Sequence, residues 1–183
     1  MPGKDTALSF RKASVGDLPI LHDWMGQAHW QQWWNEPEPD AEIELIRNMI
    51  EGRDTTEPWM ILHSGEPVGY IQCWFVKDNL GPEVLAEHPW LIRVPVDSVG
   101  IDLSVGPESL LSRGIGSAAL RLFAEELCAR GHRTIIIDPD PANVRARRAY
   151  AKAGFRDRPE YTGDAADVSI MQYAPGEADE MDK

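Results

Sequence analysis

The chain has 183 residues, 43% of them hydrophobic, which is enough to bury a core as one globular domain. Its formal net charge is -12 without a lysine or arginine cluster, which disfavours nucleic acid and anionic membranes as partners. No apolar run approaches the roughly 20 residues that span a bilayer, and the N-terminus lacks the apolar core of a secretory signal. We expect a soluble cytoplasmic protein, with an acidic surface that serves solubility and also attracts cationic ligands.

The first fifty residues predict a strand followed by two helices. Alternation indicates a strand over 7–13, and Ser14 to Asp17 is a capping signal for an amphipathic helix carrying Leu18, Leu21, Trp24 and Met25. A tryptophan-rich patch follows at 30–34, and then a proline-studded acidic loop that cannot be a helix interior. Asp40 is expected to cap a second helix with Ile43, Ile46 and Ile50 on its inner face.

The rest of the chain predicts alternating strands and helices without an internal repeat or a linker. The segments 59–62 and 68–76 flank a turn and predict an antiparallel hairpin, and 77–97 is predicted to be a long irregular connection. The remaining segments are predicted to be strands at 98–105, 133–137 and 168–173 and helices at 114–129 and 142–153. The fold class is thus a mixed α/β sheet with two central helices, in a single domain over 1–174 with a disordered acidic tail at 175–183.

The two cysteines, Cys73 and Cys128, lie in apolar contexts without CxxC spacing or nearby histidine pairs. A metal site or a redox pair is therefore not expected. Both are interpreted as reduced thiols in the core.

Between the apolar strand at 98–105 and the following helix lies the segment Ser112-Arg-Gly-Ile-Gly-Ser117, called the SRGIGS loop below. Gly114 and Gly116 allow the backbone to approach an anion, and the first N–H groups of the helix, with its dipole, favour negative charge there. Turning alone is the competing interpretation, because many loops use glycine for that purpose.

A second unit of strand, loop and helix carries Asp138-Pro-Asp-Pro-Ala-Asn143, then Tyr150, then Ala153-Gly-Phe155. Together with the SRGIGS loop it resembles the GNAT superfamily of acetyltransferases, in which the asparagine and the tyrosine face the cofactor arm and its sulfur. The resemblance implies acetyl-CoA as cofactor, with its pyrophosphate on the loop. It also implies the GNAT fold, a mostly antiparallel central sheet flanked by helices with a cofactor cleft between two splayed central strands.

The chain departs from the superfamily at Leu111, where many members carry glutamine or arginine that holds a phosphate. Arg113 and backbone amides are expected to carry more of that role here. Taken alone, Asn143 is better explained as a helix cap and Tyr150 as a buried aromatic. The two together, at this spacing, favour contact with the cofactor. The cofactor-binding residues implied by the resemblance are Leu103, Val105, Ser112, Arg113, Gly114, Ile115, Gly116, Ser117, Asn143 and Tyr150.

Within that superfamily the chain looks like an aminoglycoside 6'-N-acetyltransferase from about Leu8 to Tyr173. Four segments carry this likeness: Leu21–Met25 leading to His29–Trp34, Gly65–Tyr70, Gly100–Asp102 and Asp138–Phe155. The resemblance implies an enzyme of antibiotic resistance, a transferase that acylates the 6'-amine of a cationic aminoglycoside.

By resemblance, Asp102 is a candidate general base and Tyr150 a candidate acid for the departing thiolate. Strand alternation agrees for Asp102, because it leaves Gly100, Asp102 and Ser104 on the face opposite the apolar residues. A buried aspartate that ties down a loop is the alternative. Since neither cysteine lies in these motifs, direct transfer in a ternary complex is expected, without an acyl-enzyme.

A ligand with several amines needs several carboxylates. By resemblance Asp138 and Asp164 match acceptor-binding aspartates. Asp54, Glu87 and Trp90 match less closely. For Asp54 and Glu87, a solvated surface charge is an equally good explanation. Trp33 and Trp34 are expected to form an apolar wall for sugar rings. The alternative is that one of the two belongs to the core. The substrate-binding set also includes Asp102.

Three other functions compete with this one. Acylation of a siderophore hydroxylysine is the first, although that group commonly carries histidine where this chain has Asp102. Acetylation of another small amine or of a protein N-terminus is the second, because a fold does not fix the acceptor. A non-catalytic coenzyme A sensor is the third, and the presence of Asp102 and Tyr150 disfavours it. The protein is expected to be a monomer or a homodimer.

Overall fold

A computed structural model of the protein describes residues 7–34, 38–165 and 167–177. Within those residues seven strands form a sheet in the order β1-β2-β3-β4-β5-β7-β6. All the strand registers given below are antiparallel except that of β4 with β5. The predicted mixed and mostly antiparallel sheet flanked by helices is confirmed.

The chain divides into two compact units that share three elements. Unit 1 comprises Met1–Cys73 and Leu103–Ala119, and unit 2 comprises Trp74–Asp102 and Leu120–Lys183. The shared elements are β3 (Glu66–Phe75), β4 (Val99–Val105) and α5 (Ile115–Ala129). In the part of the chain that the structure describes, no helix is long and apolar enough to cross a membrane.

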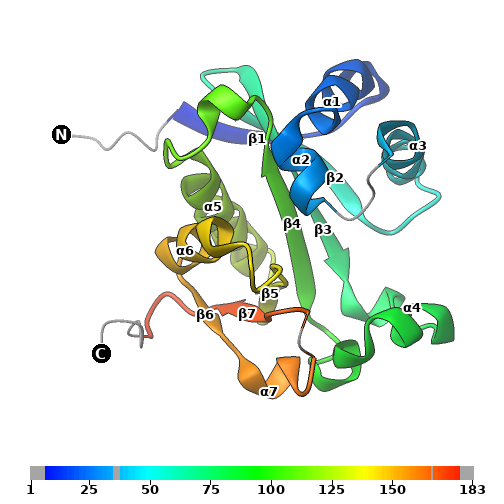
Figure 1. Ribbon diagram of the computed structural model, residues 1–183, viewed down its shortest axis with the longest axis vertical. Coiled ribbons are helices and arrows are strands. Elements are labelled where there is room, and N and C mark those ends of the chain that lie inside the picture. Colours follow the sequence, from blue (N-terminus) through cyan, green and yellow to red (C-terminus); the bar gives the residue numbers. More distant parts are fainter. Residues whose placement is uncertain (1–6, 35–37, 166, 178–183) are drawn as a thin grey trace. The chain divides into compact units, whose positions relative to one another are not determined.

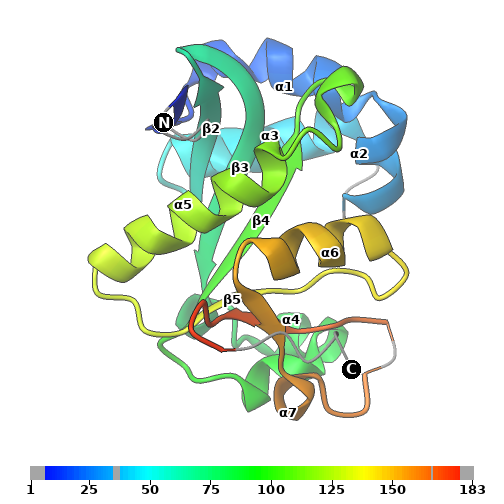
Figure 2. The same cartoon turned by 90° about the vertical axis from the view of Figure 1, so that its left-hand side faces the viewer.

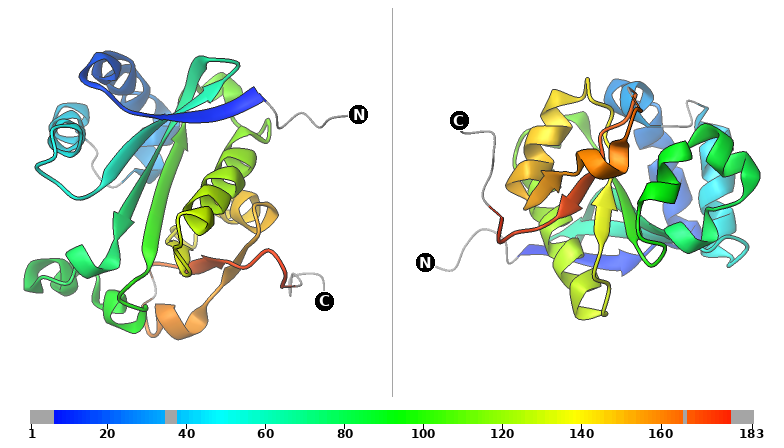
Figure 3. Two further views of the ribbon diagram at one scale, coloured as in Figure 1. Left: turned by 180° about the vertical axis from the view of Figure 1, so that it is seen from behind. Right: turned by 90° about the horizontal axis from the view of Figure 1, so that it is seen from below.

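In unit 1, β1 (Leu8–Lys12), β2 (Glu57–His63) and β3 lie side by side (Figure 3, left). The predicted hairpin is confirmed, and its turn residues Ser64 and Gly65 both have positive φ, 51° and 88°. Two central residues with positive φ make a turn whose twist matches that of the strands, which fixes the register of the hairpin.

The helices of unit 1 are α1 (Leu18–Met25), α2 (Ala28–Trp33) and α3 (Pro39–Ile50). The unit also contains two short 3-10 segments, η2 (Val15–Asp17) before α1 and η5 (Glu108–Leu110) after β4. Helices α1 and α3 lie side by side (Figure 1) and enclose a core that includes Leu21, Ile46, Met60 and Tyr70. The predicted inner face of α3 is thus confirmed. Asp40 does not cap this helix: Pro39 is its first residue and Glu38 its N-cap, because proline is favoured in a first turn.

The start of α1 is fixed by an ion pair. Arg11 donates two hydrogen bonds of 2.7 Å to the carboxylate of Asp17, which also accepts from the backbone N–H and Oγ of Ser14. The guanidinium of Arg11 and these further donors lower the pKa of Asp17 to about 2, although burial opposes the shift.

In unit 2, β5 (Ile135–Ile137) pairs in parallel with β4 and antiparallel with β7 (Met171–Tyr173), which pairs with β6 (Phe155–Asp157). The helices are the second half of α5, α4 (Pro82–Glu87), α6 (Val144–Lys152) and α7 (Pro159–Thr162). Helix α7 lies beside the 3-10 segment η4 (Pro89–Arg93), as Figure 2 shows. A second core cluster includes Val76, Trp90, Leu91, Val94, Ile136 and Ile170.

Several sequence predictions for unit 2 need correction. The connection 77–97 is not irregular: α4 and η4 form in it, with prolines at their first positions, and the 3-10 segment η3 (Val76–Asp78) precedes them. The predicted last strand is shortened to β7, because the N–H of Ser169 bonds instead to the carbonyl of Pro139. Strand β6 and helix α7 were not predicted.

Other predictions for this unit hold. Helix α6 stops at Gly154, whose φ is 98°, and Phe155 after it is fully buried, as predicted. Both cysteines are free thiols and Cys73 is buried, but Cys128 is exposed on α5, so its assignment to the core was wrong. Of the predicted tail, Glu177 bonds to Arg158 with both carboxylate oxygens, and 178–183 lie outside the described residues.

Candidate functional site

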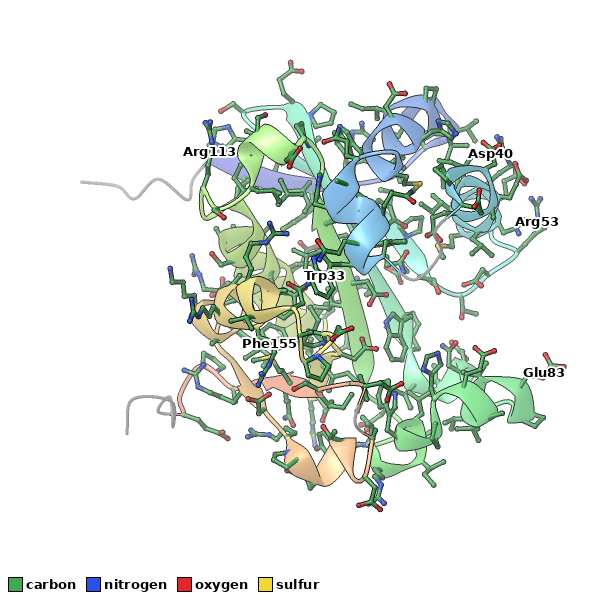
Figure 4. All side chains as sticks on the ribbon, viewed as in Figure 1. Trp33, Asp40, Arg53, Glu83, Arg113 and Phe155 are labelled. Atoms are coloured by element: carbon green, nitrogen blue, oxygen red, sulfur yellow. The ribbon has the colours of Figure 1, made fainter. Side chains whose placement is uncertain are left out.

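The SRGIGS loop belongs to unit 1 and leads directly into α5. Ser112 and Gly114 both have positive φ, 58° and 82°, and Figure 4 shows Arg113 on the loop between them. The helical ladder begins where the N–H of Ala118 bonds to the carbonyl of Gly114. The backbone N–H groups that precede Ala118 therefore have no carbonyl partner within the helix. Such N–H groups at the start of a helix commonly bind anions.

The end of β4 is held in place by helices α1 and α2. The carbonyl of Val105 accepts from His29 Nε2 at 2.9 Å and from Trp30 Nε1 at 3.1 Å. A side chain on Gly106 would overlap the ring of Trp24, so only glycine allows this close approach. A Cβ on Gly116 would lie 3.7 Å from a methyl group of Val105, so the first turn of α5 is seated against the strand end.

These contacts, which fix the loop's base, were missed at the sequence level. His29 and Trp30 were quoted only as part of a resemblance, and they lie more than 70 positions from Val105 in the sequence. Leu111 stands where many members of the superfamily that the chain resembles carry a phosphate-binding side chain. It is partly buried, and its N–H donates to the carbonyl of Glu108 at the end of η5. Arg113 is exposed and is the charged side chain of the loop.

The second candidate region belongs to unit 2 and consists of Asp102 on β4, Asp138 directly after β5 and Tyr150 on α6, called the acid cluster below. The parallel register sets Gly100 opposite Ile136. Asp102 lies two residues beyond Gly100 on β4, and Asp138 lies two residues beyond Ile136, just after β5 ends. The charge of Asp102 acts on Asp138, so the two carboxyl groups lie close together. All three side chains are partly buried.

The electrostatics of the acid cluster agree with this geometry. Burial raises the pKa of Asp138 well above its ordinary value, and the negative charge of Asp102 adds to the shift. Burial also raises the pKa of Tyr150, again with contributions from Asp102 and then Asp138, while Arg145 opposes them. The phenol thus keeps its proton at neutral pH, and the two carboxyl groups repel each other in a partly buried site.

Asn143 begins α6 and points its Oδ1 at the N–H of Ala146, at 3.1 Å. The helix-cap interpretation of this residue is therefore confirmed. Tyr150 follows two helical turns later, on the same helix. Arg147, between them, pairs with Asp157 of β6 at 3.1 Å and so fixes α6 against the sheet of unit 2.

The predicted substrate-binding residues differ in their surroundings. Trp34 packs against Trp30 and Tyr70 at the core of unit 1, which agrees with the alternative that one of the two tryptophans is a core residue. Trp33 is partly buried. Trp90 is 5% exposed within the core of unit 2. Three of the predicted acids are exposed. Asp54 lies between α3 and β2, Glu87 at the end of α4, and Asp164 after α7.

The loop and the cluster offer different chemistry. A backbone-lined helix start with an exposed arginine suits a diphosphate, whereas two carboxylates beside a protonated phenol suit an ammonium group that must lose a proton. Among the described residues no group of three or more histidine, cysteine, aspartate or glutamate side chains is arranged to hold a metal ion.

Comparison with known proteins decides the family. A model described as an acetyltransferase (GNAT) domain matches residues 14–162, which include the SRGIGS loop and the acid cluster. The chain belongs to the GNAT acetyltransferases. This GNAT chain is 28% identical over 173 residues to aminoglycoside N(6')-acetyltransferase type 1 of Klebsiella pneumoniae, covering 91% of this chain and 83% of the relative.

Two further relatives bear on the acceptor. The lysine N-acyltransferase MbtK of Mycolicibacterium paratuberculosis is 26% identical over 181 residues, covering 95% of this GNAT chain and 76% of the relative. A crystal structure of aminoglycoside acetyltransferase AAC(6')-Ib in complex with coenzyme A and kanamycin matches with a TM-score of 0.73 and 25% identity, covering 90% of this chain and 92% of that one.

Proposed function

We propose that this GNAT protein transfers the acetyl group of acetyl-CoA to the 6'-amine of an aminoglycoside. The observation that carries the proposal is the proximity of Asp102 and Asp138 in unit 2: each lies two residues after the last pair of β4 and β5, and the charge of Asp102 acts on Asp138. The similarity to the Klebsiella pneumoniae enzyme over 91% of the chain supports the same acceptor.

The paired carboxylates supply what a polyamine acceptor needs. An aliphatic amine is mostly protonated at neutral pH, and only its neutral form attacks a thioester. Asp102 attracts the ammonium group and takes its proton, directly or through one water, while Asp138 neutralises further positive charge. Burial and then the charge of Asp102 raise the pKa of Asp138, so a bound ammonium group would favour the charged form of this carboxyl.

The SRGIGS loop supplies the binding of the donor. Its helix N-terminus and Arg113 fit the pyrophosphate of coenzyme A, and the acetyl thioester is the activated group that this donor brings when bound. We propose the same cofactor-binding residues as the sequence analysis does, with Leu103 and Val105 presenting strand backbone to the arm of the donor. Tyr150, whose raised pKa keeps its proton in place, donates it to the departing thiolate sulfur.

We further propose direct transfer in a ternary complex. Cys73 is buried, and partial desolvation together with the charge of Glu125 raises the pKa of the exposed Cys128, which disfavours the thiolate that an acyl-enzyme requires. We propose Trp33, Asp54, Glu87 and Asp164 as the remaining acceptor contacts. Trp34 and Trp90, which pack in the cores of the two units, would support the site from within.

We also propose a cytoplasmic monomer or homodimer with residues 1–174 as its acetyltransferase domain. The acidic composition disfavours nucleic acid as a partner. One other acceptor has a specific observation in its favour. The similarity to MbtK over 95% of the chain supports acylation of a lysine side chain.

Purified protein tests the two acceptors against each other. With acetyl-CoA and kanamycin or tobramycin it should release coenzyme A thiol, and a 6'-hydroxyl analogue should give much less. A susceptible bacterial host that expresses the protein should grow at higher concentrations of the same drugs. Turnover with lysine or hydroxylysine and none with any aminoglycoside would show that the proposal is wrong.

A further inference from the structure

Trp74, near the end of β3, lies across Gly100 of β4, and both belong to unit 2. A Cβ placed on Gly100 would overlap the indole of Trp74. Gly100 does not have a positive φ, so its backbone would suit any residue. Glycine is therefore required at this position for space, because the indole occupies the volume that a side chain would fill.

The direction of that missing side chain locates the indole relative to the acid cluster. Side chains two residues apart on a strand point to the same face, and their Cα atoms are separated by roughly 6–7 Å. The indole over Gly100 thus lies on the face of β4 that carries Asp102. It stands next to the carboxylate that also acts on Asp138 and Tyr150.

The indole is held firmly from behind. It packs against the core cluster of unit 2, and its edge meets Trp90 with ring centroids 6.5 Å apart at 68°. Trp90 is buried and is in turn flanked by His88 at 6.3 Å. Trp74 itself remains partly exposed, so it combines a fixed orientation with accessible ring surface.

A fixed aromatic surface beside two carboxylates suits a cationic ligand that is built of rings. The C–H face of a sugar ring packs on an indole, and an ammonium group is attracted both to the ring face and to the carboxylates. A flexible alkylamine presents no flat face to such a wall. We propose that Trp74 is an acceptor-binding residue that selects aminoglycoside rings, with Gly100 as the position that gives it room. This inference rests on the proposed function.

Calorimetric titration of Trp74→Ala and Trp74→Phe tests the inference. For Trp74→Ala the Kd for kanamycin should rise roughly tenfold, with the Kd for acetyl-CoA unchanged, because the lost contact is with the sugar ring. The 6'-hydroxyl analogue should lose binding by a similar factor, since the contact that the substitution removes is the one with the sugar ring. Trp74→Phe should recover most of the affinity.

Trp59→Ala is the matched control, because Trp59 is a partly buried tryptophan of β2 that stacks with Lys12 in unit 1. It should leave the Kd for kanamycin unchanged. Gly100→Ala tests the same geometry without removing the indole, and it should weaken kanamycin binding because the new methyl group displaces Trp74.

The outcomes separate the two proposals. If wild-type protein binds and acetylates kanamycin while Trp74→Ala binds it equally well, the inference about Trp74 is wrong and the proposed function stands. A fall in Tm with an unchanged Kd for kanamycin would show that Trp74 only packs the core. If the wild type neither binds nor acetylates any aminoglycoside, both proposals are wrong.

Discussion

The SRGIGS loop and the acid cluster are built in different ways. The loop is one contiguous segment whose anion-binding groups are backbone N–H groups, set by the conformations of Ser112 and Gly114 and by the start of α5. The cluster takes single side chains from β4, from the residue after β5 and from α6. A backbone site tolerates most changes of side chain, whereas a side-chain site is lost when one functional group is replaced. This contrast predicts which substitutions matter in each region.

Asp102→Asn should have the largest effect. The amide keeps the shape of the side chain but accepts no proton from the amine, so kcat should fall roughly a hundredfold or more with kanamycin. The Kd for acetyl-CoA should stay within about twofold of wild type, because the loop is unaffected. Steady-state kinetics and calorimetry measure the two quantities. Unchanged turnover would remove Asp102 from the mechanism.

Gly114→Ala should act on the other region and only through the backbone. A Cβ at Gly114 would meet no atom within 4 Å, so there is room for the methyl group. The substitution is unfavourable because the φ of Gly114 is 82°, a backbone conformation that costs a residue with a side chain roughly 1–2 kcal/mol. The KM for acetyl-CoA should rise about tenfold with little change in the Kd for kanamycin.

Ser112→Gly is the matched control for that variant. It removes a side chain from a residue that already has a positive φ of 58°. Because the proposed cofactor contact of Ser112 is through its backbone, the variant should bind acetyl-CoA as well as wild type does. Equal losses of acetyl-CoA affinity in the two variants would contradict the view that the loop acts through its backbone.

Asp138→Asn should show a smaller effect in which stability and binding change in opposite directions. The raised pKa of Asp138 means that the folded protein prefers the protonated form, so ionisation destabilises it progressively as pH rises from the ordinary aspartate pKa through the raised one. At neutral pH the asparagine variant should therefore have a higher Tm than wild type. Its affinity for kanamycin should fall, and it should lose the part of the pH dependence of binding that comes from this carboxylate.

Thermal unfolding measured at pH 4 and pH 7 tests the sign of that prediction. The difference in Tm between Asp138→Asn and wild type should be larger at pH 7, where more of the wild-type carboxylate is ionised. A lower Tm for the variant at pH 7 would mean that the folded protein stabilises the charge of Asp138.

The same contrast explains what the sequence revealed. The hairpin, α5 and the loop were predictable because each depends on neighbouring residues, such as the apolar alternation of β4 and the glycines that follow it. Strand β6 and helix α7 were missed, since elements of three and four residues are too short to show a period. The helices inside 77–97 were missed although prolines begin both.

Contacts between distant residues set the limit of prediction for the site. Asp102, Asp138 and Tyr150 were found through a resemblance, while their proximity became clear only from the pairing of β4 with β5 and from their mutual electrostatic effects. No local pattern indicated that His29 and Trp30 hold the carbonyl of Val105, or that Gly100 makes room for Trp74. Each of these depends on which elements pack together, which a local pattern does not contain.

The central claim is that the acid cluster binds the acceptor while the SRGIGS loop binds the donor. Calorimetric titration of Asp138→Asn and Gly114→Ala, each with kanamycin and with acetyl-CoA, tests it most directly. The account predicts that Asp138→Asn loses affinity for kanamycin alone and that Gly114→Ala loses affinity for acetyl-CoA alone. Loss of affinity for the same ligand in both variants would contradict it.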